Sequence, residues 1–205
     1  MIHSLPLSLP LLLLLLVFVL LIILVEVRVL TYAYRKVGVH PRYAFAVMML
    51  SLVGSAVDIP LFAIVATEAG RASSPTIVAL NVGGALIPIL VSLYLLARTR
   101  MYVRMLIGMA VVAAVVHSLA ELVPGVGIAV PMIAPPLVAA GVALLLAFRR
   151  APPVAYVAGS MGTLIGADLL NLGQIARLGA PVVSIGGAGT FDGVFLTGIL
   201  AGLLA

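Results

Sequence analysis

About seven apolar segments, each as long as a membrane-spanning helix, occupy almost the whole chain. They are expected at residues 5–30, 43–66, 76–97, 101–123, 126–148, 153–172 and 189–205. A helix needs ~20 apolar residues to cross a bilayer. Hydrophobic residues make up 64% of the chain and charged residues only 8%, against about 25% charged in an ordinary soluble domain. The pattern predicts an all-α, polytopic membrane protein with one domain, residues 1–205, and the lipid bilayer as partner.

The first apolar run predicts a retained helix rather than a cleaved signal peptide. No Lys or Arg precedes it, and it is longer than the roughly 7–15 residues of a signal-peptide core. The net charge of +5 does not imply a nucleic-acid partner, because the basic residues stand at the ends of the apolar segments. The chain has no Cys, so it forms no disulfide and carries no thiolate chemistry.

The basic residues are distributed unequally between the two sides of the expected topology. Nine of them flank the loops between segments 1 and 2, 3 and 4, and 5 and 6, whereas only Arg71 and Arg177 lie on the opposite side. Short loops rich in Lys and Arg remain on the cytoplasmic side of a membrane. This bias predicts that the N-terminus is outside and the C-terminus inside.

Polar residues within or beside the apolar segments are the candidates for function, because a charge in a bilayer is costly to keep. On the expected topology they gather toward the outer side, except Glu26, which has Arg28 nearby. A one-sided cluster predicts a polar cavity open to the outside, or a site under the outer loops. The expected ligands of a substrate or ion are Asp58, Asn81, Asp168, Asn171 and Asp192.

Two helical spacings bear on these candidates. Ser51, Gly54, Ser55 and Asp58 would form one small, polar face of the second segment. That face is either part of the site or a packing seam in which a neighbour satisfies Asp58. Asp168 and Asn171, at i and i+3, would share a face of the sixth segment.

His117 and Glu121, at i and i+4, are the remaining candidates for a metal site. Together with two Asp they could provide an oxygen-rich metal site for Zn, Mn or Fe. No known ligand spacing supports that reading, and the two residues could instead pair near the water interface. We therefore predict no metal and no cofactor.

Glycine motifs stand at three places in the sequence. The spacings Gly162–Gly166 and Gly198–Gly202 are typical of close contact between membrane helices. Gly186-Gly-Ala-Gly189 precedes the last segment, where a helix N-terminus could bind an anion. Asp192 would repel an anion, so we prefer a re-entrant bend of the backbone. Asp192 could also complement the positive start of the helix.

A short internal similarity predicts a parallel repeat. Asn81-Val-Gly-Gly-Ala85 resembles Ser184-Ile-Gly-Gly-Ala188, and the segments upstream of each motif also resemble one another. Because the copies are four helices apart, they would cross the membrane in the same direction. The expected halves are residues 1–98 and 125–205, with a linker helix at 101–123.

The same motifs resemble a known family. The stretches 162–171 and 184–193, with Asn81–Pro88 and Pro124–Pro131, are similar to an uncharacterised prokaryotic membrane-protein family, domain of unknown function 1614. The resemblance covers most of the chain after about residue 40. It implies a multi-pass protein of a bacterial or archaeal inner (plasma) membrane and supplies no activity.

A weaker resemblance is to intramembrane aspartyl proteases of the presenilin and prepilin-peptidase types, which use two Asp on adjacent helices. Asp168 and Asp192 could share a proton and activate a water molecule in that way. However, neither Asp directly follows a Gly-x-Gly: Thr190 and Phe191 separate Asp192 from Gly187-Ala-Gly189, and Gly-Ala precedes Asp168. The loop that joins the two helices is also expected outside, whereas it is cytoplasmic in presenilins.

The topology is also analogous to that of SWEET-type transporters, which have parallel repeats. We therefore expect an inner-membrane transport or solute-binding protein whose carboxylates bind a small solute, a cation or a proton. The alternative is an intramembrane hydrolase with Asp168 and Asp192 as catalytic residues, so whether the protein is an enzyme stays open. The sequence leaves the oligomeric state open as well.

Overall fold

The computed structural model describes residues 9–65, 67–68, 71–72, 75–123, 127–175, 181–187 and 193–205. The α-helices are α1 (Leu9–Val37), α2 (Pro41–Gly54), α3 (Ile87–Thr99), α4 (Tyr102–Leu119), α5 (Ala134–Ala147), α6 (Ala151–Thr163), α7 (Leu172–Ile175) and α8 (Gly193–Leu204). Short π-helical turns, η1 (Val82–Leu86) and η3 (Leu164–Asp168), and 3-10 turns, η2 (Phe148–Arg150) and η4 (Leu169–Asn171), adjoin them. The strands are β1 (Asp58–Ile64), β2 (Thr67–Glu68), β3 (Arg71–Ala72), β4 (Thr76–Asn81), β5 (Glu121–Val123), β6 (Gly127–Ala129) and β7 (Val182–Ile185).

Within the described ranges, four helical segments are long and apolar enough to cross a membrane. They are Leu12–Val37, Val82–Thr99, Tyr102–Leu119 and Ala134–Gln174, and two shorter apolar helices are Arg42–Gly54 and Gly193–Leu204. The segment Ala134–Gln174 contains both α5 and α6, which pack against each other on either side of η2. The expectation of a mainly helical membrane protein is confirmed, and the count of seven spans stays a prediction.

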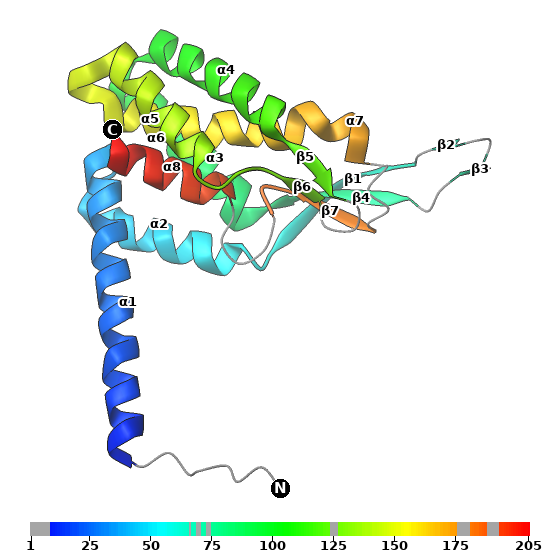
Figure 1. Ribbon diagram of the computed structural model, residues 1–205. Helices are drawn as coiled ribbons and strands as arrows, with labels where there is room; N and C mark the ends of the chain where they lie inside the picture. Colours follow the sequence, from blue (N-terminus) through cyan, green and yellow to red (C-terminus); the bar gives the residue numbers. More distant parts are fainter. Residues whose placement is uncertain are drawn as a thin grey trace, which may run out of the picture.

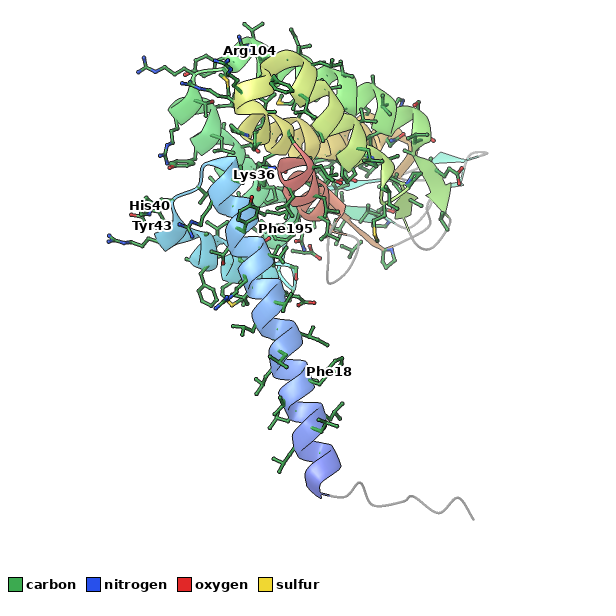
Figure 2. The ribbon with its side chains drawn as sticks, turned by 60° about the vertical axis from the view of Figure 1, so that its left-hand side comes forward. Phe18, Lys36, His40, Tyr43, Arg104 and Phe195 are labelled. Carbon is green, nitrogen blue, oxygen red and sulfur yellow. The ribbon has the colours of Figure 1, made fainter. Side chains whose placement is uncertain are left out.

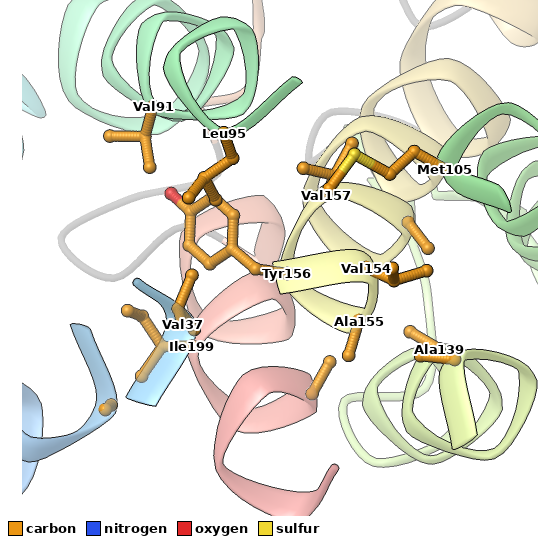
Figure 3. Packing of buried hydrophobic residues seen from close by; sticks show 14 of the residues in the cluster. Val37, Val91, Leu95, Met105, Ala139, Val154, Ala155, Tyr156, Val157 and Ile199 are labelled. Atoms are coloured by element: carbon orange, nitrogen blue, oxygen red, sulfur yellow. The ribbon is translucent and has the colours of Figure 1, made fainter. Parts of the chain in front are cut away.

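Helix α6 lies at the centre of the bundle and packs against α4, α5 and α8. Ten of its residues are buried, among them Ala155, Ala158 and Gly159. Such small side chains let neighbouring helices approach closely, and this close packing is one of the forces that associate helices in lipid. Figure 3 shows Tyr156 of α6 between Val37 of α1 and Leu95 of α3, with Ile199 of α8 close by. These side chains belong to one buried cluster.

The two Gly-x-x-x-Gly motifs lie at helix contacts, as their spacing predicts. A Cβ on Gly166 would stand 2.4 Å from the backbone oxygen of Ala113 on α4. A Cβ on Gly202 would stand 2.4 Å from a methyl group of Val37 on α1. The packing role expected for these glycines is therefore confirmed.

Helix α1 runs across the direction of the other helices and projects from the bundle (Figure 1). Only its C-terminal part is packed, with Ala33, Tyr34 and Val37 fully buried. The residues from Leu12 to Glu26 are all exposed, as Phe18 illustrates in Figure 2. A helix apolar all round has its surface satisfied by lipid or by another apolar surface.

Strands replace helix in the second and third apolar segments, and the short strands β5 and β6 stand at the adjoining ends of the fourth and fifth. The expectation of an all-α chain is wrong in these places. Helix α2 ends at Gly54, and the chain continues as β1, which pairs antiparallel with β4. Pro60 explains part of this change, because proline cannot donate the hydrogen bond that a helix interior needs. It stands on the edge strand of the sheet beside an irregularity in the register, which is where strands tolerate proline.

The sheet has the order β1-β4-β7, with β7 parallel to β4. It lies at the end of the bundle opposite the turns between α1 and α2 (Figure 1). At those turns Lys36 donates to the Leu203 oxygen at 2.7 Å and Arg98 to the Gly38 oxygen at 3.0 Å. One end of the bundle is therefore basic and the other carries the sheet. The orientation of these ends in the membrane stays a prediction.

Candidate functional site

The chain changes from strand to helix at Asn81, and this first junction (residues 81–85) is organised by the Asn81 side chain. Its Oδ1 accepts a hydrogen bond from the Gly84 N–H at 2.8 Å, which is the contact of an N-cap. Its Nδ2 donates to Oδ1 of Asp58 and to the Ser55 oxygen, both at 2.9 Å. Asn81 is buried, with 3% of its surface exposed. It therefore joins the end of α2, the start of β1 and the start of η1.

The predicted small face of the second segment is only partly right. Ser51 and Gly54 pack on the first junction: the Ser51 hydroxyl donates to the Gly83 oxygen at 2.6 Å, and a Cβ on Gly54 would stand 3.0 Å from the Gly83 nitrogen. The packing interpretation is confirmed for these two residues. Asp58 does not lie on that face, because the helix ends before it and Asp58 begins β1.

The second junction (residues 184–187) begins within strand β7 and is held by Asp168. Oδ2 of Asp168 accepts a hydrogen bond from the Gly186 N–H at 2.7 Å. Asp168 is half-buried and ends the π-helical turn η3. A π turn adds a residue to a helix and often occurs at functional sites. Gly186 has a φ of 71°, a left-handed conformation that glycine adopts without steric cost.

The two junctions touch each other. A Cβ on Gly186 would stand 2.7 Å from the Ala85 Cβ and 2.8 Å from the Ala85 nitrogen. A Cβ on Gly187 would stand 3.2 Å from the Asn81 Cβ. Strands β4 and β7, which lead into the junctions, pair from Ile77 to Leu80 and from Val182 to Ile185. The structure thus brings Asp58, Asn81 and Asp168 to two sides of one glycine-lined contact.

Both carboxylates keep one oxygen free of hydrogen bonds to the described residues. Asp58 accepts through Oδ1 and Asp168 through Oδ2, and neither forms an ion pair with a Lys or Arg in those ranges. Asp58 is exposed and Asp168 half-buried. Each carboxylate can therefore accept a further donor or a cation while it keeps its contact with the junction.

Asn171 does not share a helix face with Asp168 in the expected way, because η3 and η4 interrupt the regular helix between them. Its Nδ2 donates to the oxygens of Gly166 and Ala167 at 3.0 and 2.9 Å. These carbonyls belong to the π turn, whose hydrogen bonding is irregular, so Asn171 stabilises the turn that carries Asp168. Asp192 lies outside the described residues.

His117 and Glu121 do not form the expected helical pair. Helix α4 ends at Leu119, and Glu121 begins strand β5. Both side chains are exposed. In the parts of the chain that the structure describes, no three His, Asp or Glu side chains converge on a common metal position.

Sequence reasoning overlooked the contact between the two glycine motifs. The likeness of Asn81–Ala85 and Ser184–Ala188 predicts a repeat, but it does not indicate that the two motifs lie side by side. In both places a stretch with β-branched residues, 76–80 and 182–185, precedes the glycine motif. This pattern favours two strands that lead into tightly packed turns. Hydropathy alone hides this signal, because buried strands and membrane helices are equally apolar.

A family model described as "Protein of unknown function (DUF1614)" matches residues 47–204. The chain belongs to this family. The matched range begins within α2 and ends with α8, so the DUF1614 region contains Asp58, Asp168 and both glycine junctions, whereas α1 precedes it. No curated protein and no solved structure matches the chain.

Proposed function

We propose that this DUF1614 protein is an inner-membrane transport or solute-binding protein. Its site comprises Asp58, Asn81, Asp168, Asn171 and Asp192, and it binds a cation, a proton or a small amine. One observation carries the proposal: Asp58 and Asp168 each hydrogen-bond to one of two glycine junctions that contact each other. Transporters bind ions and solutes where helices are interrupted within the bundle.

The chemistry of the contact fits a cationic ligand. Each carboxylate has one oxygen that accepts no hydrogen bond from the described residues. Keeping a carboxylate inside a membrane protein without a cationic partner is energetically costly. A bound cation or proton would offset that cost. Because each acid is also hydrogen-bonded at one of the two junctions, binding would change their geometry. It would thereby couple the ligand to the packing of α3, which follows η1, and of α8, which contacts η1.

We further propose that the two junctions are copies of an internal, parallel repeat. In support, each junction stands at the end of a strand, and the two strands, β4 and β7, are parallel neighbours in one sheet. Each junction also donates a hydrogen bond to an Asp of the preceding segment. The copies differ in detail: Asp58 acts through Asn81, whereas Asp168 contacts the backbone of Gly186 directly.

The hydrolase alternative uses Asp168 and Asp192 as catalytic residues. It requires the two carboxylates to share a water molecule, and Asp192 lies outside the described residues, so no contact favours it. Cleavage of a co-reconstituted substrate that stops in both Asp168→Asn and Asp192→Asn would support it over transport.

Cation binding is expected to raise the melting temperature of the purified protein in lipid nanodiscs. The probes are NaCl, KCl and ethylammonium chloride, with choline chloride at equal ionic strength as the reference. A ligand at 100 times its Kd stabilises the folded state by about 2.7 kcal/mol. We expect at least one probe to do so in the wild type and not in Asp58→Asn. Equal stabilisation of the wild type and Asp58→Asn would show that Asp58 does not bind the cation.

The sheet end of the bundle is expected outside and the basic end inside. Because the chain has no Cys, single cysteines can be introduced into a clean background. Ala72→Cys in strand β3 should react with an impermeant maleimide in intact cells, whereas Ala205→Cys should react only after permeabilisation. The reverse pattern would place the candidate site on the cytoplasmic side.

A further inference from the structure

A second site is suggested by a cavity of about 560 Å³ between α1, α2, η1 and α8. This volume lies in the range of small-molecule sites, ~300–1,000 Å³. Its wall on α1 extends from Ile23 to Leu30, and its wall on α2 from Met48 to Ser55. Phe195 and Leu196 of α8 close one side. Asp58, Asn81, Asp168 and Asn171 do not line it, so the cavity is separate from the site proposed above.

The lining is apolar apart from Glu26, two serines and the backbone of Gly83 and Gly84. The serine hydroxyls already donate to backbone oxygens, Ser51 to Gly83 at 2.6 Å and Ser55 to Leu52 at 2.7 Å. The polar part of the cavity therefore presents hydrogen-bond acceptors and one carboxylate. A ligand that fits it has an apolar body and a cationic or donor group.

Glu26 has no ion-pair partner among the described residues. Arg28, which the sequence suggested as its neighbour, is two positions along α1, and side chains at i and i+2 do not face each other on a helix. A carboxylate beside apolar side chains at membrane depth is costly unless a cation accompanies it. Glu26 is exposed, and the cavity presents it at the α1 wall as a carboxylate that no Lys or Arg of the described residues pairs with.

An exposed apolar surface leads along α1 to the wall of the cavity. The residues from Leu12 to Val25, which precede the Glu26 position on α1, are apolar and exposed, and Figure 2 shows this part of α1 projecting from the bundle. Such a surface lies among acyl chains in a bilayer. An amphiphile dissolved in the membrane can therefore reach the cavity without crossing water.

We propose that this cavity binds an amphiphile with an alkyl chain and an amine head group, its chain against Met48, Met49 and Leu196 and its ammonium beside Glu26. The ligand is either a free long-chain amine or a membrane lipid with a primary amine. The proposal does not rest on the function of Asp58 or Asp168.

Photolabelling of the full-length protein in phosphatidylcholine nanodiscs tests this proposal. The probe is a twelve-carbon alkylamine with a diazirine in its chain, and labelled peptides are mapped by mass spectrometry. We expect labels on the lining of α1 and α2, and at least tenfold better competition by dodecylamine than by dodecanol at equal membrane mole fraction. Competition by phosphatidylethanolamine would identify a lipid, and competition by dodecylamine alone a free amine.

Two variants separate charge from space. Glu26→Gln should bring dodecylamine and dodecanol within about threefold of each other while the label stays in the cavity. Met49→Trp, which fills the cavity, should remove most of the label, whereas Phe18→Trp on exposed α1 should not. Size-exclusion profiles and melting temperatures check that the variants fold. Labelling spread evenly along α1, or no preference for the amine in the wild type, would overturn the proposal.

Discussion

Gly83→Ala is expected to destabilise the bundle by at least about 3 kcal/mol, the upper range for forcing an extra group into a packed interior. A Cβ at this position would stand 2.0 Å from the Ser51 oxygen and 2.4 Å from the Ser55 nitrogen. Both are backbone atoms of the α2 C-terminus, so no side-chain rotation can relieve the overlap. The hydrogen bond from the Ser51 hydroxyl to the Gly83 oxygen would be lost as α2 moved away.

Thermal unfolding in nanodiscs, followed by circular dichroism, measures this effect. Gly141→Ala is the matched control, because Gly141 lies within helix α5 and a Cβ there would meet no atom within 4 Å. Alanine should stabilise that helix by about 0.5–1 kcal/mol. If Gly83→Ala unfolds at the same temperature as the wild type, α2 and the first junction are not packed as described.

Asp168→Asn and Asp168→Ala are expected to differ in their free energy of unfolding. Both are expected to lose the response to cations. Asparagine retains an oxygen that can accept from the Gly186 N–H, whereas alanine leaves that N–H without its acceptor. The alanine variant should lose about 1.5–3 kcal/mol, the contribution of a hydrogen bond to a charged group. Both variants lack the carboxylate, so neither should show the cation-dependent rise in melting temperature.

The same unfolding measurements with NaCl, KCl or ethylammonium chloride, against choline chloride, provide both readouts. Asn171→Ala serves as a comparison, because it removes donors to the π turn and keeps the carboxylate of Asp168. It should lower stability and retain part of the cation response. If Asp168→Asn binds the cation as well as the wild type, the role of Asp168 is confined to holding the second junction.

Hydropathy predicted where most helices lie, because lipid requires apolar side chains and favours helices that satisfy their own backbone. The same rule could not predict that residues 58–64 and 76–81 form strands. Their backbone groups are satisfied by pairing between β1 and β4, which is a long-range contact. Ile, Val and Phe suit a membrane helix and an apolar strand equally, so Pro60 was the clearest local signal.

The chemical character of the site residues was sufficient to predict them from the sequence. Their arrangement in space could not be predicted in this way. Asp58 and Asn81 are 23 positions apart and meet because β1 and β4 form a hairpin, in which they face each other. Helical spacing therefore gave the wrong neighbours for Asp58, and likewise for His117 and Glu121, because both predictions extended helices past their real ends. The π turn that ends at Asp168 has no recognisable sequence signal.

Flux through proteoliposomes tests the assignment of Asp58 and Asp168 most directly. Vesicles with the wild-type protein are expected to move protons, Na⁺ or ethylammonium down an imposed gradient, read with an internal pH dye or a radiolabelled solute. Asp58→Asn and Asp168→Asn should each reduce the flux at least tenfold, while Glu121→Gln, an exposed acid of strand β5, should leave it unchanged. Equal flux through all four proteins, or no flux above protein-free vesicles for any probe, would contradict the assignment.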